Sequence, residues 1–300
     1  MAMERQQIWS IGMYSGPSPL RLEPMPGVRN PVLTASDVTD VAADFVADPF
    51  LVRQGGQWNL FFEIGCAEQD RIGWATSPNG IDWTYQQVIL CPPGVRLSYP
   101  HVFLHDGQWL MIPESWVAGE ARLYRAVSFP TRWQLDTVLI REPFIVDCSP
   151  FRHEGRWWMF ANGGPPVNSQ TLDLYFAPDV RGPWTRHPRS PLNTSRAEAR
   201  PAGRVVQLDG KLYRLGQDCE KAYGTAVRAY EVLRLSETDY TERRIDPPLL
   251  GPTGQGWNAD GMHHLDAARL DDGSFLAAVD GWHYSTPGES VARPETHRQE

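Results

Sequence analysis

Apolar residues come in short runs along the chain, each followed by a glycine turn and then a second run rich in aromatic residues. The five copies of this unit are ADPFLVRQGGQWNLFFE, SYPHVFLHDGQWLMIPE, VDCSPFRHEGRWWMFAN, ARPAGRVVQLDGKLYRLGQD and GMHHLDAARLDDGSFLAAVDG. Their turn glycines are 51, 48, 55 and 63 residues apart, at Gly56, Gly107, Gly155, Gly210 and Gly273. That spacing is typical of one four-stranded propeller blade, so the pattern predicts five blades.

A second hairpin follows each of the first four units, but the fifth unit is followed only by a polar tail. The N-terminal segment QIWSIGMYSG is therefore expected to complete the last blade and remove the open sheet edge. The predicted fold is an all-β five-bladed β-propeller with blades of four antiparallel strands, closed by this N-terminal strand. It forms a single domain over residues 1–283, and residues 284–300 are expected to be disordered. Sandwiches and other barrels share strand–turn–strand patterns and stay open as alternatives.

Charge and hydropathy narrow the range of partners. The chain has 36 acidic and 28 basic residues, a net charge of −8, which argues against binding nucleic acid or an anionic membrane through bulk charge. No apolar run approaches the ~18 residues of a membrane-spanning helix. The N-terminus MAMERQQIWS lacks the apolar stretch of a secretory signal, so we expect a cytoplasmic protein without nucleic-acid or membrane partners.

Equivalent positions early in each unit are expected to converge, because the first strand of every propeller blade lines the central channel. Asp48, Tyr99 and Asp147 each lie eight residues before their turn glycine. A carboxylate at the start of an otherwise apolar strand is unusual, although an aspartate can also cap a turn there. The two aspartates, from blades one and three, are therefore predicted to face each other across the channel.

Two facing carboxyls resemble the acid and base of glycoside hydrolysis. Their origin in non-adjacent blades favours an inverting arrangement, with roughly 6.5–9.5 Å between the carboxyls. A nearby arginine would keep one carboxyl ionised, and burial among aromatic rings would raise the pKa of the other. Glu114 directly follows an apolar strand and is the provisional acid, with an arginine-paired or solvated role as its alternative. Glu198 is a weaker candidate.

Further polar residues near the predicted channel are candidates for substrate binding: Tyr99, His101, Arg200, Arg204, Gln217, Asp218, His263, His264 and Asp266. Adjacent residues of a strand point to opposite faces, so only one of the two neighbouring histidines is expected to face the channel. This segment alone is then not expected to supply three metal ligands. No metal site or cofactor is predicted, no nucleotide-binding glycine loop is found, and a channel cation stays open.

Several strings in the chain, taken in order, resemble the glucosamine inositolphosphorylceramide transferase N-terminal-domain family. They include ADPFLV, IGWATSPNGIDW, LSYPHVF, MIPES, GRWWMFA, ARPAGR, DGKLYRLGQDC and WNADGMHHLD, and the resemblance extends from about Phe45 to Gly281. It implies a five-bladed propeller similar to family 43 type glycoside hydrolases, the arabinanases and xylosidases. In those enzymes one Asp is the base, a second Asp orients and tunes pKa, and a Glu is the acid. Asp48 matches the first role and Asp147 the second, whereas blade four reads ARPAGR where the acid is sought.

The functional prediction is a glycoside-hydrolase-like enzyme acting on a small glycoside or sugar conjugate, with Asp48 as base, Asp147 orienting and Glu114 as acid. Two alternatives stay open. The same propeller can be a biosynthetic tailoring enzyme that performs a cyclisation, elimination or rearrangement by acid/base catalysis. It can also be a non-catalytic carbohydrate-binding module.

Overall fold

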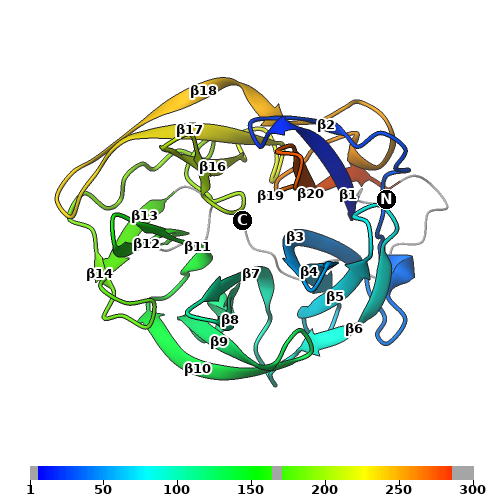
Figure 1. Ribbon diagram of the computed structural model, residues 1–300, viewed down its shortest axis with the longest axis horizontal. Coiled ribbons are helices and arrows are strands. Elements are labelled where there is room, and N and C mark those ends of the chain that lie inside the picture. Colours follow the sequence, from blue (N-terminus) through cyan, green and yellow to red (C-terminus); the bar gives the residue numbers. More distant parts are fainter. Residues whose placement is uncertain (1–5, 164–170, 286–300) are drawn as a thin grey trace, which may run out of the picture.

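Five antiparallel sheets surround a central axis in the computed structural model, which describes residues 6–163 and 171–285 (Figure 1). Each sheet has four strands, and the strands that come first in their units lie nearest the axis in Figure 1. The prediction of an all-β five-bladed propeller with four-stranded blades is confirmed. The single-domain boundary at residue 283 stays a prediction, and most of the expected tail, residues 286–300, lies outside the described residues.

The blades follow the order of the sequence repeats. Blade one comprises β3 (Phe45–Gln54), β4 (Gln57–Gly65), β5 (Arg71–Ser77) and β6 (Thr84–Leu90). Blade two comprises β7 (Ser98–His105), β8 (Gln108–Glu114), β9 (Glu120–Ser128) and β10 (Arg132–Arg141). Blade three comprises β11 (Val146–His153), β12 (Arg156–Asn162), β13 (Leu172–Ala177) and β14 (Thr185–Arg186). Blade four comprises β15 (Val206–Leu208), β16 (Lys211–Asp218), β17 (Ala226–Leu235) and β18 (Tyr240–Leu250).

Blade five joins the two ends of the chain, as expected. It comprises β19 (Leu265–Arg269), β20 (Phe275–Tyr284), β1 (Gln7–Ser18) and β2 (Arg21–Pro24). β1 pairs with β20 from Gln7 opposite Tyr284 to Gly16 opposite Phe275. This pairing closes the ring. Without β1, the edge of β20 that faces away from β19 would present unpaired backbone N–H and C=O groups.

Helical structure is limited to three short 3-10 turns in the described part of the chain: η1 (Ala35–Asp37), η2 (Trp116–Ala118) and η3 (Gly256–Asn258). Among residues 6–163 and 171–285, no helix has the length and apolar character needed to cross a membrane.

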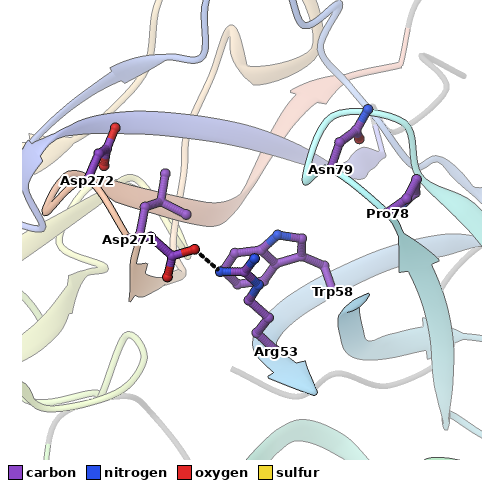
Figure 2. Close-up of a pocket in the computed structure, with 7 residues that line it drawn as sticks. Arg53, Trp58, Pro78, Asn79, Asp271 and Asp272 are labelled. Atoms are coloured by element: carbon purple, nitrogen blue, oxygen red, sulfur yellow. Dashed lines mark hydrogen bonds and ion pairs between the residues drawn. The ribbon is translucent and has the colours of Figure 1, made fainter. Parts of the chain in front are cut away.

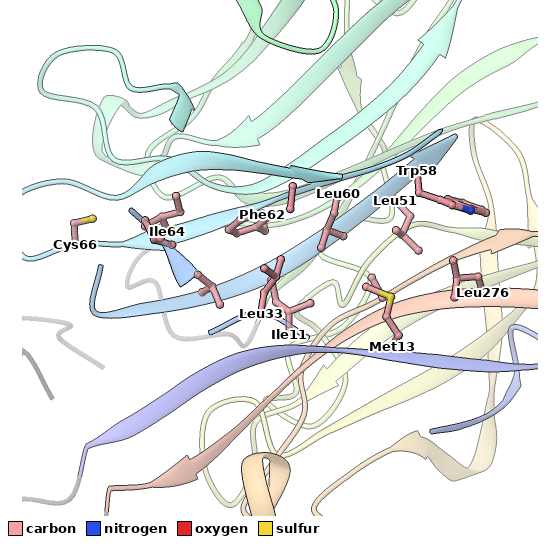
Figure 3. Packing of buried hydrophobic residues seen from close by; sticks show 14 residues of the cluster. Ile11, Met13, Leu33, Leu51, Trp58, Leu60, Phe62, Ile64, Cys66 and Leu276 are labelled. Atoms are coloured by element: carbon pink, nitrogen blue, oxygen red, sulfur yellow. The ribbon is translucent and has the colours of Figure 1, made fainter. Parts of the chain in front are cut away.

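The blades pack face to face through apolar side chains that alternate along each strand. On β4, Leu60 and Phe62 pack against blade five, whereas Phe61 between them packs against blade two. Successive residues of a strand point to opposite faces, and both faces of this strand are buried. Figure 3 shows the blade five side of this packing, where Ile11 and Met13 of β1 meet Leu60 and Phe62. The inter-blade packing explains why the unit reads as an almost continuous apolar run.

Candidate functional site

Three residues at the start of the inner strands share an unusual backbone conformation. Asp48, Tyr99 and Asp147 have φ values of 53°, 44° and 52°, in the left-handed region. Each lies where the pairing of the first two strands shifts register, between Ala47 and Phe50 in blade one. A left-handed residue other than glycine costs roughly 1–2 kcal/mol, and such strain tends to gather at functional sites. The equivalence inferred from glycine spacing therefore corresponds to one repeated bulge.

The bulges bring side chains of neighbouring blades into contact. Asp48 Oδ2 of blade one accepts a hydrogen bond of 3.2 Å from the backbone N–H of Tyr99 in blade two. Asp48 is 6 % exposed and Asp147 2 % exposed, so both carboxyls lie in a nearly dry environment. The distance between these two carboxyls, and hence the inverting arrangement, stays a prediction.

Arg200 joins the carboxyls of blades two and three. Its Nε donates to Asp147 Oδ2 at 2.5 Å, and its Nη2 lies 3.4 Å from Glu114 Oε2. The guanidinium also lies over the ring of Tyr223, 5.1 Å from the ring centre. Blade four thus contributes a cation to the group of carboxyls through the segment ARPAGR.

Glu114 is the member of this group whose surroundings favour its protonated form. Burial raises the pKa of Glu114 well above its ordinary range, the charge of Asp147 raises it further, and Arg200 opposes both. Glu114 is also hydrogen-bonded to Asp147, an arrangement that favours a proton on Glu114. Asp147 and Arg200 form the fixed ion pair, so Glu114 is the carboxyl suited to give up a proton.

A second charged group lies on the other side of Asp48. His263 Nδ1 is 2.8 Å from Asp280 Oδ1, and His263 Nε2 is 3.7 Å from Asp48 Oδ1. Burial raises the pKa of Asp48, although His263 and His264 lower it. For His263, burial lowers the pKa, but the charge of Asp280, the hydrogen bond to Asp280 and the charge of Asp48 together outweigh burial, so the pKa is raised.

Both neighbouring histidines approach Asp48, and the expectation that at most one of them faces the channel stays a prediction. His264 Nδ1 lies 3.6 Å from Asp48 Oδ1, almost the same distance as His263 Nε2. The alternation rule applies to strands, but β19 begins only at Leu265. The two histidines lie in irregular backbone before it and can turn to the same side.

Below the carboxyls, the centre of the propeller is filled rather than open. The Tyr99 hydroxyl accepts a 2.7 Å hydrogen bond from Gly203 N and lies 2.7 Å from Ser149 Oγ. Gly203 has φ 132°, and a Cβ there would lie 1.9 Å from the carbonyl oxygen of Leu265, so only glycine fits. Blades two, three, four and five thus meet around one phenol.

Removal of the Tyr99 hydroxyl should destabilise the fold. Tyr99→Phe leaves the buried N–H of Gly203 without its acceptor, and we expect the free energy of unfolding to fall by about 1–3 kcal/mol. Urea denaturation measures this change. The control is Tyr85→Phe. The Tyr85 hydroxyl donates a hydrogen bond to Asp40 at the surface, so this variant should lose less free energy of unfolding. Equal losses in the two variants would contradict a special role for the central phenol.

The remaining predicted binding residues fall into two groups. His101, Arg204 and Asp266 form a deeper cluster, in which Arg204 Nε donates to Asp266 Oδ1 at 2.9 Å and Arg204 Nη1 lies 3.2 Å from His101 Nε2. Gln217 and Asp218 are engaged elsewhere: Gln217 donates to the carbonyl of Pro201, and Asp218 pairs with Arg228 at 2.8 Å. Neither contact involves the carboxyls of the site. The weaker candidate Glu198 pairs at 3.5 Å with Arg244, which is half exposed.

Sequence reasoning missed three residues that shape the site: Asp280, Trp9 and Tyr223. Asp280 ends an apolar run in SFLAAVDG, the same signal that identified Glu114, and could have been found in that way. Trp9 and Tyr223 flank the ring of His263 at centroid distances of 4.2 and 5.4 Å. They gave no signal, because aromatic residues are frequent throughout the chain.

A metal ion is poorly accommodated by the acidic and histidine groups near Asp48. Ligand atoms of Asp48, His263 and Asp280 all lie within 4.8 Å of one another. The two oxygens of Asp280, however, already receive the backbone N–H groups of Asp48, His263 and His264 in addition to His263 Nδ1. A carboxylate with its lone pairs directed to four donors has little capacity left for a cation. No cofactor is predicted from the sequence, and a channel cation stays an open alternative.

A surface depression of about 310 Å³ lies away from these carboxyls (Figure 2). It is lined by Arg53, Trp58, Pro78, Asn79, Leu270, Asp271 and Asp272. Arg53 and Asp271 form a 3.0 Å ion pair across it, with side chains that are 41 % and 88 % exposed. Arg53 lies near the end of β3 and Asp48 near its beginning, so the two sites are separated by about 16 Å of strand.

The fold is shared with solved glycoside hydrolase structures of low sequence identity. A putative glycoside hydrolase from Bacteroides ovatus is 15% identical with a TM-score of 0.63, covering 86% of this chain and 95% of that one. A structure from glycoside hydrolase family 130, described as containing mannoside phosphorylases and hydrolases, is 14% identical with a TM-score of 0.60, covering 90% and 95%. The alpha-L-arabinanase of Cellvibrio cellulosa complexed with arabinohexaose is 13% identical with a TM-score of 0.55, covering 80% and 96%.

Curated relatives are more similar in sequence. Glucosamine inositolphosphorylceramide transferase 1 of Oryza sativa subsp. japonica is 36% identical over 298 residues, and that of Arabidopsis thaliana is 35% identical over 299. Each alignment covers 91% of this chain, but the chain spans only about 40% of the length of these relatives. Residues 2–282 match the family described as glucosamine inositolphosphorylceramide transferase 1, N-terminal. The chain therefore belongs to this N-terminal-domain family, and the resemblance inferred from its motifs is confirmed.

Proposed function

We propose that this propeller cleaves the glycosidic bond of a small glycoside or sugar conjugate, with Asp48 as general base and Glu114 as general acid. The observation that carries the proposal is the meeting of two buried carboxyls, Asp147 and Glu114, at the Arg200 guanidinium, with the buried Asp48 carboxyl near enough to act on the charges of both. Burial and the charge of Asp147 raise the pKa of Glu114 well above its ordinary range, which suits an acid. Burial also raises the pKa of Asp48, but the charges of His263 and His264 oppose that rise and favour the ionised form that a base needs.

In this mechanism Asp48 removes a proton from a water molecule as that water attacks the anomeric carbon. Glu114 gives its proton to the departing oxygen, so the products are a free sugar and the hydroxyl of the second group. Arg200 holds Asp147 and Glu114 in fixed positions and stabilises the charge that appears on Glu114 when its proton leaves. The left-handed backbone of Asp48 orients its carboxyl for this step.

The choice of substrates to test follows from the relatives. The name of these relatives joins glucosamine to inositolphosphorylceramide, so glucosaminides and inositol phosphate glycosides come first. Arabinosides, xylosides and galactosides follow, because an arabinanase, a xylosidase and a galactanase share the fold. In the experiment, the purified chain and the variant Asp48→Asn are each incubated with this panel of glycosides, and the released sugar is measured. Release that depends on Asp48 supports the proposal. Saturable binding without any release would refute it and favour a binding module.

Glu114→Gln gives a prediction that depends on the leaving group. Glutamine preserves shape but cannot donate a proton as an acid, so glycosides with alkyl leaving groups should react about 10²-fold more slowly. Nitrophenyl glycosides need little protonation and should stay within about tenfold of the parent. Steady-state kinetics on both substrate classes checks this. An equal loss on both would contradict the role of Glu114 as acid.

The pH profile of Glu114→Gln follows from the sign of the shift. The folded-state pKa of Glu114 is raised, so the stabilisation from its bound proton is complete below the unfolded value of about 4.3. This stabilisation is lost as pH rises through the folded pKa. The parent should become less stable over this window, while Glu114→Gln should show a flatter curve in urea denaturation at several pH values.

A further inference from the structure

Asp280 organises the backbone and side chains around Asp48. It is fully buried, and its Oδ1 accepts the backbone N–H groups of His263 at 3.2 Å and His264 at 2.9 Å. Its Oδ2 accepts the backbone N–H of Asp48 at 2.9 Å. Donors of this number favour the ionised carboxylate. Burial raises the pKa of Asp280, but the charge of His263, the hydrogen bond from it, the charge of His264 and the backbone N–H of Asp48 together lower it below its ordinary value.

The contact with Asp280 decides which nitrogen of His263 faces the base. An ionised carboxylate only accepts, so the Nδ1 that lies 2.8 Å from Asp280 carries a proton. Nε2 is then the nitrogen directed to Asp48 Oδ1, at an ion-pair distance of 3.7 Å. When Nε2 is also protonated, the imidazolium lies between two carboxylates.

Packing keeps the His263 ring in this orientation. Trp9 lies against it at 4.2 Å and Tyr223 contacts it edge-on at 5.4 Å. Gly224 approaches from the same side as Tyr223, and a Cβ there would lie 2.8 Å from His263 Cβ and 2.6 Å from the Trp9 ring. The ring has no room to turn away from Asp48.

The charged groups around His263 come from three blades. Asp280 of β20 and Asp48 of β3 favour the imidazolium, whereas Arg200 and burial oppose it. Tyr223 presents a ring, and the neighbouring His264 has a pKa that burial lowers. His263 and His264 are thus almost equally distant from Asp48, but the pKa of His263 is raised and that of His264 is lowered, and only His263 has a carboxylate on its other ring nitrogen.

We propose that His263, oriented by Asp280, is a positioning residue whose imidazolium is the counter-ion of the Asp48 carboxylate. The inference rests on the proposed function, in which Asp48 is the base. A buried base needs a nearby positive charge to stay ionised in mildly acidic solution, and Arg200 is already engaged by Asp147 and Glu114. The site then has two separate ion pairs, one for the acid and one for the base.

The first test needs no substrate. The full chain is labelled with ¹⁵N-histidine, and the ring nitrogens are followed by NMR from pH 5 to 9, with His263→Gln identifying the signal. We expect Nδ1 to remain protonated and Nε2 to titrate above the ordinary histidine value of about 6.5. Asp48→Asn and Asp280→Asn should each lower that midpoint. Asn tolerates the left-handed backbone at position 48, so Asp48→Asn is expected to fold. Asp48→Asn therefore tests the inference even if Asp280→Asn fails to fold.

The matched control is His105→Gln. His105 pairs with Asp106 at 3.3 Å in the turn at the far end of β7, and its loss should leave the His263 midpoint unchanged. A midpoint at or below about 6.5 in the parent, or one that Asp48→Asn does not move, would overturn the inference.

The second test uses turnover on any substrate that the panel identifies. In His263→Gln the acidic limb of the pH–rate profile should move to higher pH by about one unit, with KM nearly unchanged. At the pH of the parent's acidic limb, kcat should then be about tenfold lower. A merely structural role would lower kcat equally at every pH, and that result would refute the counter-ion role. If no substrate is found, the proposed function fails, while the NMR titration still decides the inference.

Discussion

Asp48→Asn is expected to reduce turnover by about 10³- to 10⁴-fold, the upper range for loss of a general acid or base. The substitution is conservative in every other respect. Asparagine adopts the left-handed backbone found at this position, and its side-chain oxygen can still accept the backbone N–H of Tyr99. The amide, however, has no negative charge and cannot take a proton from water. Steady-state kinetics together with a sugar-binding titration separates lost chemistry from lost binding.

Asp271→Asn is the control for this experiment. Asp271 is an exposed carboxylate that pairs with Arg53 at the far end of β3, so its variant should retain the parent's turnover. Binding should survive in both variants. If Asp48→Asn stayed within tenfold of the parent, Asp48 could not be the base.

Arg200→Met is expected to lower the free energy of unfolding by about 3–5 kcal/mol, the usual cost of removing one partner from a buried ion pair. Methionine preserves much of the apolar stem but leaves Asp147 without its donor at 2.5 Å and Glu114 without the one at 3.4 Å. Asp147 is 2 % exposed, so water cannot replace the guanidinium. Urea denaturation at pH 7 measures the loss.

Arg53→Met is the matched comparison for Arg200→Met. It breaks an arginine–aspartate pair at 3.0 Å, but that pair lies at the surface and should be worth about 0–1 kcal/mol. A similar loss in the two variants would show that burial does not determine the strength of the Arg200 pair.

The repeats predicted the architecture because a propeller blade is a local structure. Its strands are consecutive, its turns need glycine, and its two buried faces require apolar residues at nearly every position of strands such as β4. Counting from the turn glycines also placed Asp48, Tyr99 and Asp147 at one equivalent position, which the structure shows as the same left-handed bulge. Even the closing strand could be foreseen, because the fifth unit lacked a second hairpin.

The partners of these residues could not be foreseen, because they come from distant parts of the chain. Asp280 is 232 residues from Asp48, and Arg200 is 53 residues from Asp147. Such pairs come together only when the ring of blades closes. Small differences in backbone position then decide which side chains are close enough to form a hydrogen bond or ion pair. The orientation of the adjacent histidines likewise depended on where β19 begins, a boundary that periodicity does not resolve to one residue.

The sequence by itself therefore determined the number of blades, the closing strand, the family and the three carboxyls of the candidate site. These follow from local periodicity, turn chemistry and the position of a charge in an apolar strand. Only the tertiary structure decided that Arg200 unites Asp147 with Glu114 and that Asp280 directs His263 to Asp48. The physical reason is that the energy of a buried charge depends on atoms within a few ångströms of it, and those neighbours exist only once the ring is closed.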